Sequence, residues 1–440
     1  MRIYGIISFI ATAAFAVGCT PHNVGTLDEY PDITPDYTGV TVPESIADLN
    51  FRMSDGRRFR KTEQTVGDTL FITVTAWEKG GRNAVQYKPF PVFISKDEID
   101  PYIAYRLIEP GYESWRYMGI YQRELSSYRE SPVVTNRVTD LGCVNCHSFP
   151  GGDPSRMLFH ARGAGGGTVF ASGEEVKKID LSKTGPGRQG VYPQWSPDGR
   201  YIAFSSNSTF QDFKILHEQA LEVFDTASDI IIFDTETSEI SEYKTDGIME
   251  TFPCWSEDGK ELYFCAADTV SDIVNDRGRI KYRLMSRSFE DGLLSDSTKL
   301  VFSIDSCSIS FPRIFDGRMI FTLSDFGTFP IWHKEADLWS LELSSGAVRS
   351  LDELNSDETE SYHSWSSNGK WIIFSSRRTD GRYTRLFISH CNDDGTFTKP
   401  FQLPQRKADS DELRLKSYNI PEFVKGEVPD YRREVKKLFE

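Results

Sequence analysis

Long apolar runs are almost absent from this sequence. After Arg2, residues 3–17 are nearly all apolar or small, and no later run reaches comparable length. A bilayer-spanning helix needs about 20 such residues, so the sequence predicts no transmembrane helix in the body of the chain. The short N-terminal run after a basic residue is typical of a secretory signal peptide.

An excess of positive charge is also absent. Lys and Arg number 50 against 65 Asp and Glu, which gives a formal net charge of −15, and no segment gathers Lys and Arg into a basic face. Nucleic-acid binding depends on such a face because the phosphate backbone dominates affinity. The composition therefore excludes nucleic acid as an expected partner and disfavours adhesion to an anionic membrane surface.

Two common catalytic motifs are missing. The sequence contains neither the Gly-x-Ser-x-Gly turn of serine hydrolases nor the Gly-x-x-x-x-Gly-Lys-Ser/Thr phosphate loop. The segment after Pro404 is too short for a hydrolase domain. These absences favour a role other than catalysis.

Cysteine is scarce, with seven residues in 440. The first, Cys19, ends the segment Ala16-Val17-Gly18-Cys19, which resembles a bacterial lipobox with Ala16 in place of the usual Leu. The resemblance implies a signal peptide over residues 1–18, lipidation of Cys19, and membrane contact through that anchor alone. Because Thr20 follows instead of Asp, it implies an outer-membrane lipoprotein on the periplasmic side of the cell envelope.

One segment of the sequence recurs at intervals of fifty to sixty residues or more. Its three clear copies read Pro-x-Trp-Ser-x-Asp/Asn-Gly around Trp195, Trp255 and, with His363 in place of Pro, Trp365; a shorter copy without Trp lies at Phe311 to Gly317. The Asp-Gly or Asn-Gly step supplies the positive φ of a tight turn, and apolar residues then alternate as in a half-buried strand. Further strands follow each copy, so the pattern predicts four-stranded propeller blades.

This repeated segment resembles the WD-repeat-related blades of TolB-like propellers over about residues 155–405. Five blades are countable, with the first one starting near Met157, and the family commonly has six, so flanking segments are expected to complete the ring. The expected fold is all-β: a five- or six-bladed propeller over residues 155–425 and a tail over 426–440. The resemblance is specific for the fold and weak for function, because such blades serve many roles.

A different organisation precedes the repeat. Residues 19–39 are expected to form a linker, and residues 40–140 a small β-rich domain, in which Leu70 to Trp77 is a clear strand. Residues 141–154 form a separate segment between this domain and the propeller.

That segment contains Cys143-Val144-Asn145-Cys146-His147. Cys-x-x-Cys-His is the attachment motif of c-type haem: two thiols bind the vinyl groups, and the adjacent His coordinates the iron. The motif predicts haem c on Cys143 and Cys146 with His147 as axial ligand. Met157 or His160 is the candidate second axial ligand; being three apart on a strand, only one would reach the iron.

Other chemistry fits the same residues. Cys143 and Cys146 could form a disulfide, or they and His147 could belong to a zinc site completed by a distant ligand. Disulfide pairing and buried free thiols both remain open for the dispersed cysteines, Cys254, Cys265, Cys307 and Cys391.

An insertion at Asp325 to Ala336 interrupts the repeat and carries Phe326, Phe329, Trp332 and His333. Loops on a propeller rim often bind partners, and aromatic side chains suit a protein or glycan. Two functions therefore follow from the sequence. The first is an envelope lipoprotein with haem c for electron transfer or redox sensing. The alternative is a haem-free propeller scaffold that binds a partner protein or envelope glycan.

Overall fold

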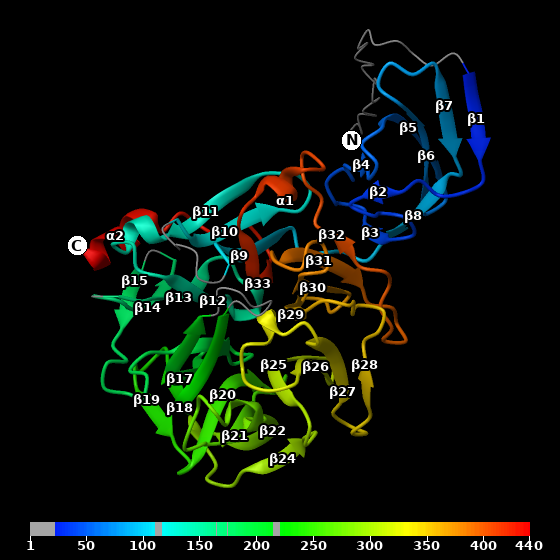
Figure 1. Ribbon diagram of the computed structural model, residues 1–440. Helices are drawn as coiled ribbons and strands as arrows, with labels where there is room; N and C mark the ends of the chain where they lie inside the picture. Colours follow the sequence, from blue (N-terminus) through cyan, green and yellow to red (C-terminus); the bar gives the residue numbers. More distant parts are fainter. Residues whose placement is uncertain (1–22, 111–116, 164, 174, 214–220) are drawn as a thin grey trace, which may run out of the picture.

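The computed structural model describes residues 23–110, 117–163, 165–173, 175–213 and 221–440. Over these residues the chain forms a six-bladed β-propeller with an additional β-sheet at its N-terminal end (Figure 1). The predicted all-β propeller is confirmed, and the blade number is six. Cys19 and the predicted signal peptide lie outside the described residues. No helix in the described part of the chain has the length and apolarity needed to cross a membrane.

Blades 2, 3, 5 and 6 each contain four strands in sequence order, with the innermost strand first. Blade 4 follows the same order and has one additional short strand. Blade 2 contains β12 (Val144–Ser148), β13 (Arg156–Ala161), β14 (Gly167–Ser172) and β15 (Glu175–Ile179). Blade 3 contains β16 (Val191–Trp195), β17 (Tyr201–Phe213), β18 (Leu221–Asp234) and β19 (Ile240–Tyr243). Blade 4 contains β20 (Ile248–Trp255), β21 (Glu261–Asp268), β22 (Arg283–Glu290), β23 (Leu293–Leu294) and β24 (Lys299–Phe302). Blade 5 contains β25 (Ser308–Phe315), β26 (Arg318–Ser324), β27 (Asp337–Glu342) and β28 (Val348–Ser350). Blade 6 contains β29 (Glu360–Trp365), β30 (Trp371–Ser376), β31 (Arg385–His390) and β32 (Phe401–Gln402).

Blade 1 closes the ring by joining the two ends of the propeller. Its innermost strand is the C-terminal β33 (Ser417–Val424), which pairs antiparallel with β9 (Tyr102–Ile108); β10 (Gly119–Glu124) and β11 (Glu130–Thr135) follow. The sequence analysis placed residues 40–140 in a separate domain, and this pairing corrects that boundary: the propeller begins at β9. The sequence could not reveal this because the partner strand lies about 300 residues away along the chain.

The N-terminal sheet has the order β1-β7-β6-β8-β3, with β5 added beside β6. Its strands are β1 (Asn23–Leu27), β3 (Thr41–Pro43), β5 (Arg58–Val66), β6 (Thr69–Trp77), β7 (Asn83–Tyr87) and β8 (Phe90–Ser95). A two-stranded ribbon, β2 (Ile33–Thr34) and β4 (Arg52–Met53), accompanies it. The sheet shares one hydrophobic core with blades 1 and 6, in which Phe90, Tyr105 and Trp371 are fully buried.

Helices are few and short among the described residues. They are η1 (Asn136–Val138), η2 (Pro150–Gly152), η3 (Arg277–Arg279), η4 (Pro330–Trp332), α1 (Ser410–Leu413) and α2 (Arg432–Phe439). Helix α2 buries Val435 in the core that belongs to blades 1 and 2, so the segment predicted as a tail packs on the propeller.

The repeated Ser-x-Asp-Gly segment forms the turn between the first two strands of a blade. In blade 4 the Ser256 hydroxyl donates to Asp258 Oδ1 at 2.7 Å and accepts from the Glu261 backbone N–H at 2.9 Å. Gly259 completes the turn with a φ of 70°, a conformation that glycine adopts without steric cost. Blades 3 and 6 repeat these bonds around Ser196 and Ser366.

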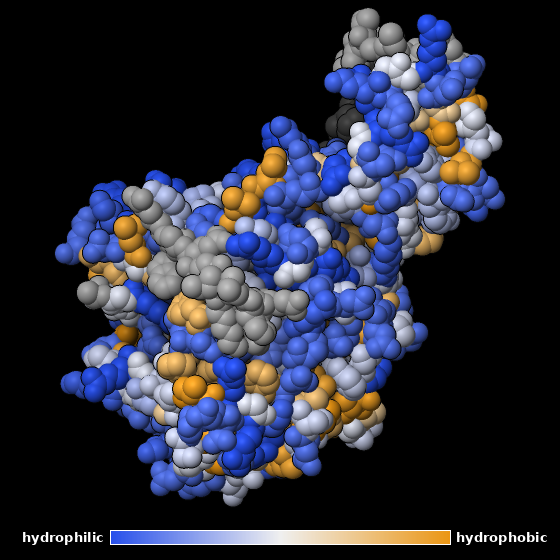
Figure 2. All heavy atoms as spheres, in the orientation of Figure 1, coloured by the Kyte–Doolittle hydropathy of each residue, from blue (hydrophilic) through white to orange (hydrophobic). Residues whose placement is uncertain are grey.

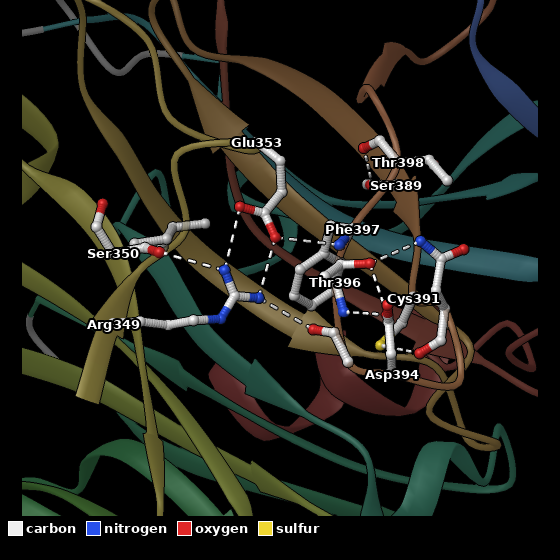
Figure 3. A network of polar contacts seen from close by, with 12 residues as sticks. Arg349, Ser350, Glu353, Ser389, Cys391, Asp394, Thr396, Phe397 and Thr398 are labelled. Carbon is white, nitrogen blue, oxygen red and sulfur yellow. Dashed lines mark hydrogen bonds and ion pairs between the residues drawn. The ribbon is translucent and has the colours of Figure 1, made fainter. Parts of the chain in front are cut away.

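Polar networks also connect adjacent blades at their outer edge (Figure 3). Arg349, on β28 of blade 5, forms an ion pair with Glu353 at 3.0 Å. Glu353 accepts a hydrogen bond from the Phe397 backbone N–H in the outer hairpin of blade 6, at 3.1 Å. This hairpin is held by Asp394, which accepts from Thr396. On the face of the molecule seen in Figure 2, the exposed surface is mainly hydrophilic.

Candidate functional site

The six innermost strands share one irregularity. Each strand contains a break in register against its neighbour, and each places one residue in the left-handed region at a φ between 50° and 52°. A non-glycine residue in this region is uncommon, so the recurrence of this conformation in every blade shows that it is a regular part of the innermost strand. These six residues, which we call the axial residues, are Cys146, Tyr192, Phe252, Phe311, Tyr362 and Ile420.

Four of the axial residues are aromatic and pack together at the centre of the ring. The rings of Tyr192 and Phe252 lie 4.4 Å apart between centroids, those of Phe252 and Phe311 4.2 Å, and those of Phe311 and Tyr362 4.9 Å. Aromatic rings at such separations attract one another beyond their burial of apolar area. The axis of the propeller is therefore filled by an aromatic plug on the side of blades 3 to 6.

The remaining two axial residues, Cys146 and Ile420, belong to the neighbouring blades 2 and 1 and have smaller side chains. A cavity of about 380 Å³ lies next to them. Its lining comes from blades 1, 2, 3, 5 and 6 and from the loops between their strands. We call it the axial cavity; small-molecule and cofactor sites generally measure roughly 300–1,000 Å³.

The Cys-x-x-Cys-His segment contributes one of the six axial residues. The sequence analysis treated residues 141–154 as a segment outside the propeller, whereas Val144–Ser148 is β12, the innermost strand of blade 2. Cys146 and His147 therefore occupy the positions of Tyr192 and Pro193 in blade 3, and of Tyr362 and His363 in blade 6.

Cys146 and His147 do not face the same space. Cys143 and Cys146 both line the axial cavity, and His147 is absent from its lining. His147 is 2% exposed, and its ring packs at 6.1 Å from that of Phe149, which lines a different cavity near the Trp-Ser-x-Asp-Gly turns. Burial lowers the pKa of His147 to about 3, so its imidazole is neutral at physiological pH.

The residues predicted as second axial ligands lie away from this cavity. Met157 is 1% exposed within the core of blades 1 and 2. His160 is 4% exposed, its Nδ1 lies 3.1 Å from the Thr168 hydroxyl, and it lines a separate cavity between blades 2 and 3. Burial lowers the pKa of His160 to about 4.

These positions decide whether the motif fits haem c in this structure. Attachment requires both thiols and the imidazole to reach one porphyrin, and here only the thiols reach the cavity. The residues present therefore do not fit the group as arranged, and haem binding stays a prediction from the sequence motif. Both cysteines are free thiols, and no group of three metal-binding side chains forms among the described residues.

Arginines dominate the charge of the axial cavity. Arg106, Arg162 and Arg377 line it, and none of the three forms an ion pair among the described residues. The Nε atoms of Arg106 and Arg162 are buried without a hydrogen-bond partner. Among the described residues, Glu109 is the only carboxylate that lines the cavity, and its Oε1 lies 3.5 Å from Lys416 Nζ.

Arg377 is held rigidly at the edge of the axial cavity. It is 4% exposed, its Nε donates to the Ile331 carbonyl at 2.6 Å, and its guanidinium carbon lies 3.4 Å from the ring centre of Trp332. Burial lowers the pKa of Arg377 to about 9. Its cationic form is thus retained at neutral pH, within a site where charge is poorly solvated.

The four aromatic and His residues proposed as a partner-binding loop separate into two groups. Phe329 and Trp332 are partly exposed and line the axial cavity. Phe326 packs against Phe224, and His333 is buried between two carboxylates, 2.7 Å from Glu222 and 3.0 Å from Glu335. The latter two residues therefore support the loop from within, while the former two face the cavity.

Arg377 and Asn207 were missed by the sequence analysis. Both follow Phe-Ser-Ser in a blade's second strand, Phe204-Ser205-Ser206-Asn207 within β17 of blade 3 and Phe374-Ser375-Ser376-Arg377 at the end of β30 of blade 6. This shared tripeptide was a usable signal, because it brings the next residue to the rim of the cavity in both blades.

Comparisons with solved structures give distant matches. TolB from Acinetobacter baumannii matches with a TM-score of 0.47 and 14% identity, covering 84% of this chain and 83% of that one. A putative TolB from Agrobacterium tumefaciens matches with a TM-score of 0.42 and 13% identity, covering 74% and 99%. Hydrazine synthase from Kuenenia stuttgartiensis matches with a TM-score of 0.45 and 11% identity, covering 76% and 48%.

No protein-family model and no curated protein matches the sequence. The structural similarities are distant and carry no functional argument. The class of the protein therefore rests on its own strand pairing: it is a six-bladed β-propeller.

Proposed function

We propose that this protein is a haem-free scaffold of the cell envelope that binds a partner protein in the axial cavity. The observation that supports it is the cavity itself: five blades contribute to its wall, and the aromatic plug closes it on the side of blades 3 to 6. A concave site with apolar walls and a few convergent polar groups is the usual form of a binding site.

The lining also argues for binding in preference to catalysis. The described residues that line the cavity carry arginine, amide, hydroxyl and apolar side chains, two thiols and one carboxylate, Glu109. Burial raises the pKa of the Cys146 thiol, against the effect of nearby Arg162 and Arg106, so this thiol is a weak nucleophile at neutral pH. No nucleophile paired with a base lines the cavity among the described residues.

A protein partner fits this lining better than a glycan. Phe329, Ile331 and Trp332 form an apolar edge, and Leu221 and Val223 lie on another part of the wall. Apolar and aromatic anchors beside Arg are the residues that concentrate binding energy in protein interfaces.

Site-specific cross-linking tests the proposal. A photo-reactive phenylalanine at Trp332 should give one adduct of discrete mass with an envelope protein, and Arg162→Gln in the same chain should abolish it. The same group at Leu293, 61% exposed on blade 4, is the control for random collision. Identical adducts from both positions, or none from Trp332, would contradict the proposal.

The envelope location rests on Cys19 and the apolar segment before it. Cys19→Ala should release the protein from the membrane fraction and abolish incorporation of a palmitate analogue. Retention of the label in this variant would remove the lipid anchor from the proposal, whatever the outcome of cross-linking.

A further inference from the structure

Two arginines of the axial cavity, Arg106 and Arg162, each have a donor that no described residue accepts. Arg106, Arg162 and Arg377 line it and form no ion pair among the described residues, although the charges of Asp380 and Glu358 act on Arg377. Arg106 and Arg162 each have a buried Nε without any hydrogen bond. A buried guanidinium donor left unpaired is costly. Such a group is retained most readily where a ligand completes it.

The missing partner must be an anion with oxygen acceptors. Arginine presents several N–H donors in a planar fork, which matches a carboxylate in a bidentate pair. Arg106 lies on β9 of blade 1 and Arg162 directly follows β13 of the neighbouring blade 2, and both line the cavity together with Cys143 and Cys146. A carboxylate beside the Cys146 axial position would meet these two arginines.

The other residues that line the cavity indicate which kind of molecule carries this carboxylate. Asn145, Asn207 and Asn419 face the cavity together with Thr209 and Gln211. Asn207 already donates to Asp225 and Thr251, and Asn419 accepts from Thr384, so Asn145 and Gln211 are the amides left to meet a ligand. Amide side chains both donate and accept hydrogen bonds, as peptide groups require. The Asn145 Oδ1 atom is itself buried without a partner.

The same cavity also has an apolar edge. Trp332 is stacked on Arg377, and Ile331 and Phe329 extend the same surface. One side chain of an extended peptide can rest there while its backbone meets the amides, because successive side chains of an extended chain point to opposite sides.

We propose that the axial cavity binds the C-terminal residues of its partner protein, with the free carboxylate held by Arg106 and Arg162 and an apolar side chain against Trp332. This inference rests on the proposed function and specifies the chemistry of the partner. In this arrangement the two arginines fix the position of the peptide's C-terminus, and the amides and the apolar edge fix the direction in which the peptide runs from it.

The experiment uses acetyl-Ala-Ala-Leu with a free carboxylate, its C-terminal amide, and decanoate as probes. Occupancy is measured by the rate at which iodoacetamide alkylates Cys143, which is partly exposed at the cavity, against Cys307, a partly exposed thiol between β24 and β25. Affinity is measured in parallel by calorimetry. The free acid should slow alkylation of Cys143 and leave Cys307 unchanged.

The amide should bind at least about tenfold more weakly than the acid, because it forfeits charge-assisted hydrogen bonds. Arg162→Gln and Arg106→Gln should reduce binding of the acid by a similar factor. Arg60→Gln, an exposed arginine on β5 of the N-terminal sheet, is the matched control for the change of charge and should bind normally.

Equal protection by acid and amide would overturn the inference. Stronger protection by decanoate than by the peptide would assign the cavity to a lipid carboxylate and overturn it as well. If Trp332 cross-links a partner while acid and amide bind equally, the proposed function stands and only the carboxylate assignment fails. If neither cross-link nor binding appears, both fail.

Discussion

Cys146 occupies in blade 2 the position that Phe252 occupies in blade 4. The two residues have φ values of 52° and 51° and lie at the same break in register of an innermost strand. One side chain adds a ring to the aromatic plug, and the other leaves room for the axial cavity. The size of a single side chain at a repeated backbone position thus determines where the ring is open.

The first prediction follows from this equivalence. Cys146→Phe should fold, because Phe252 and Phe311 already adopt the same backbone conformation. The added ring should fill part of the cavity and reduce binding of acetyl-Ala-Ala-Leu at least about tenfold. Calorimetry measures the affinity, and circular dichroism checks the fold. Cys146→Ser, which keeps the volume, should bind normally; full binding by the Phe variant would show that the ligand lies elsewhere.

The second prediction concerns haem. His147 occupies the position of His363, whose Nε2 lies 2.9 Å from the Ile320 carbonyl in the adjacent blade, and it is buried away from the two thiols. Expression with a haem-attachment pathway should therefore give a protein without covalent haem. Mass spectrometry of the mature chain and the visible absorption spectrum measure this directly. A mass increase of one haem, lost in Cys143→Ala, would show that β12 rearranges during maturation.

The third prediction concerns pH. Burial opposes protonation of His333, but hydrogen bonds and charge interactions with Glu222 and Glu335 raise its pKa to about 9. Since this value exceeds that of the unfolded chain, the stabilisation is complete below about pH 6.5 and is lost as pH rises through 9. It amounts to on the order of 3 kcal/mol.

Thermal unfolding between pH 6 and pH 10 measures this effect. The Tm of the wild-type protein should fall over this range, and His333→Gln should lower the Tm at pH 6 while flattening the profile. Asp225, whose pKa burial raises to about 7, also destabilises the fold as pH rises toward 7, so the comparison with the variant is made above pH 7.5. Parallel profiles there would rule out His333 as the source.

The fourth prediction concerns closure of the ring. Strand β33 pairs with β9 and supplies Tyr418, Phe423 and Val424 to the cores beneath blade 1. Deleting residues 417–440 should leave β9 with an open edge and those cores incomplete, so the protein should be insoluble or lack a cooperative unfolding transition.

The matched comparison is deletion of residues 1–27 from the other end. This removes β1, an edge strand whose five residues are all exposed, and should shift the Tm by only a few degrees. Both variants are compared by solubility and by differential scanning calorimetry. A C-terminal deletion that unfolds cooperatively near the wild-type Tm would show that blade 1 is stable without its innermost strand.

The sequence by itself determined the repeating unit. Pro-x-Trp-Ser-x-Asp-Gly encodes a turn whose hydrogen bonds are local, with Ser256, Asp258 and Gly259 within four residues of each other. Alternating apolar residues after it encode strands for the same reason, since the two-residue period is a property of the strand alone. These features gave the all-β class, the propeller and five of its blades.

Tertiary structure decided what the pattern could not. The pairing of β33 with β9 joins residues far apart in sequence and leaves no local periodicity to detect. The surroundings of Cys146 and His147 depend on the strand that contains them, because adjacent residues of an innermost strand face different spaces. Cys146 therefore lines the axial cavity, whereas His147 is buried away from it, although the two residues belong to one sequence motif. Arg106, Arg162 and Arg377 come from three blades, and only closure of the ring brings their charges to one cavity.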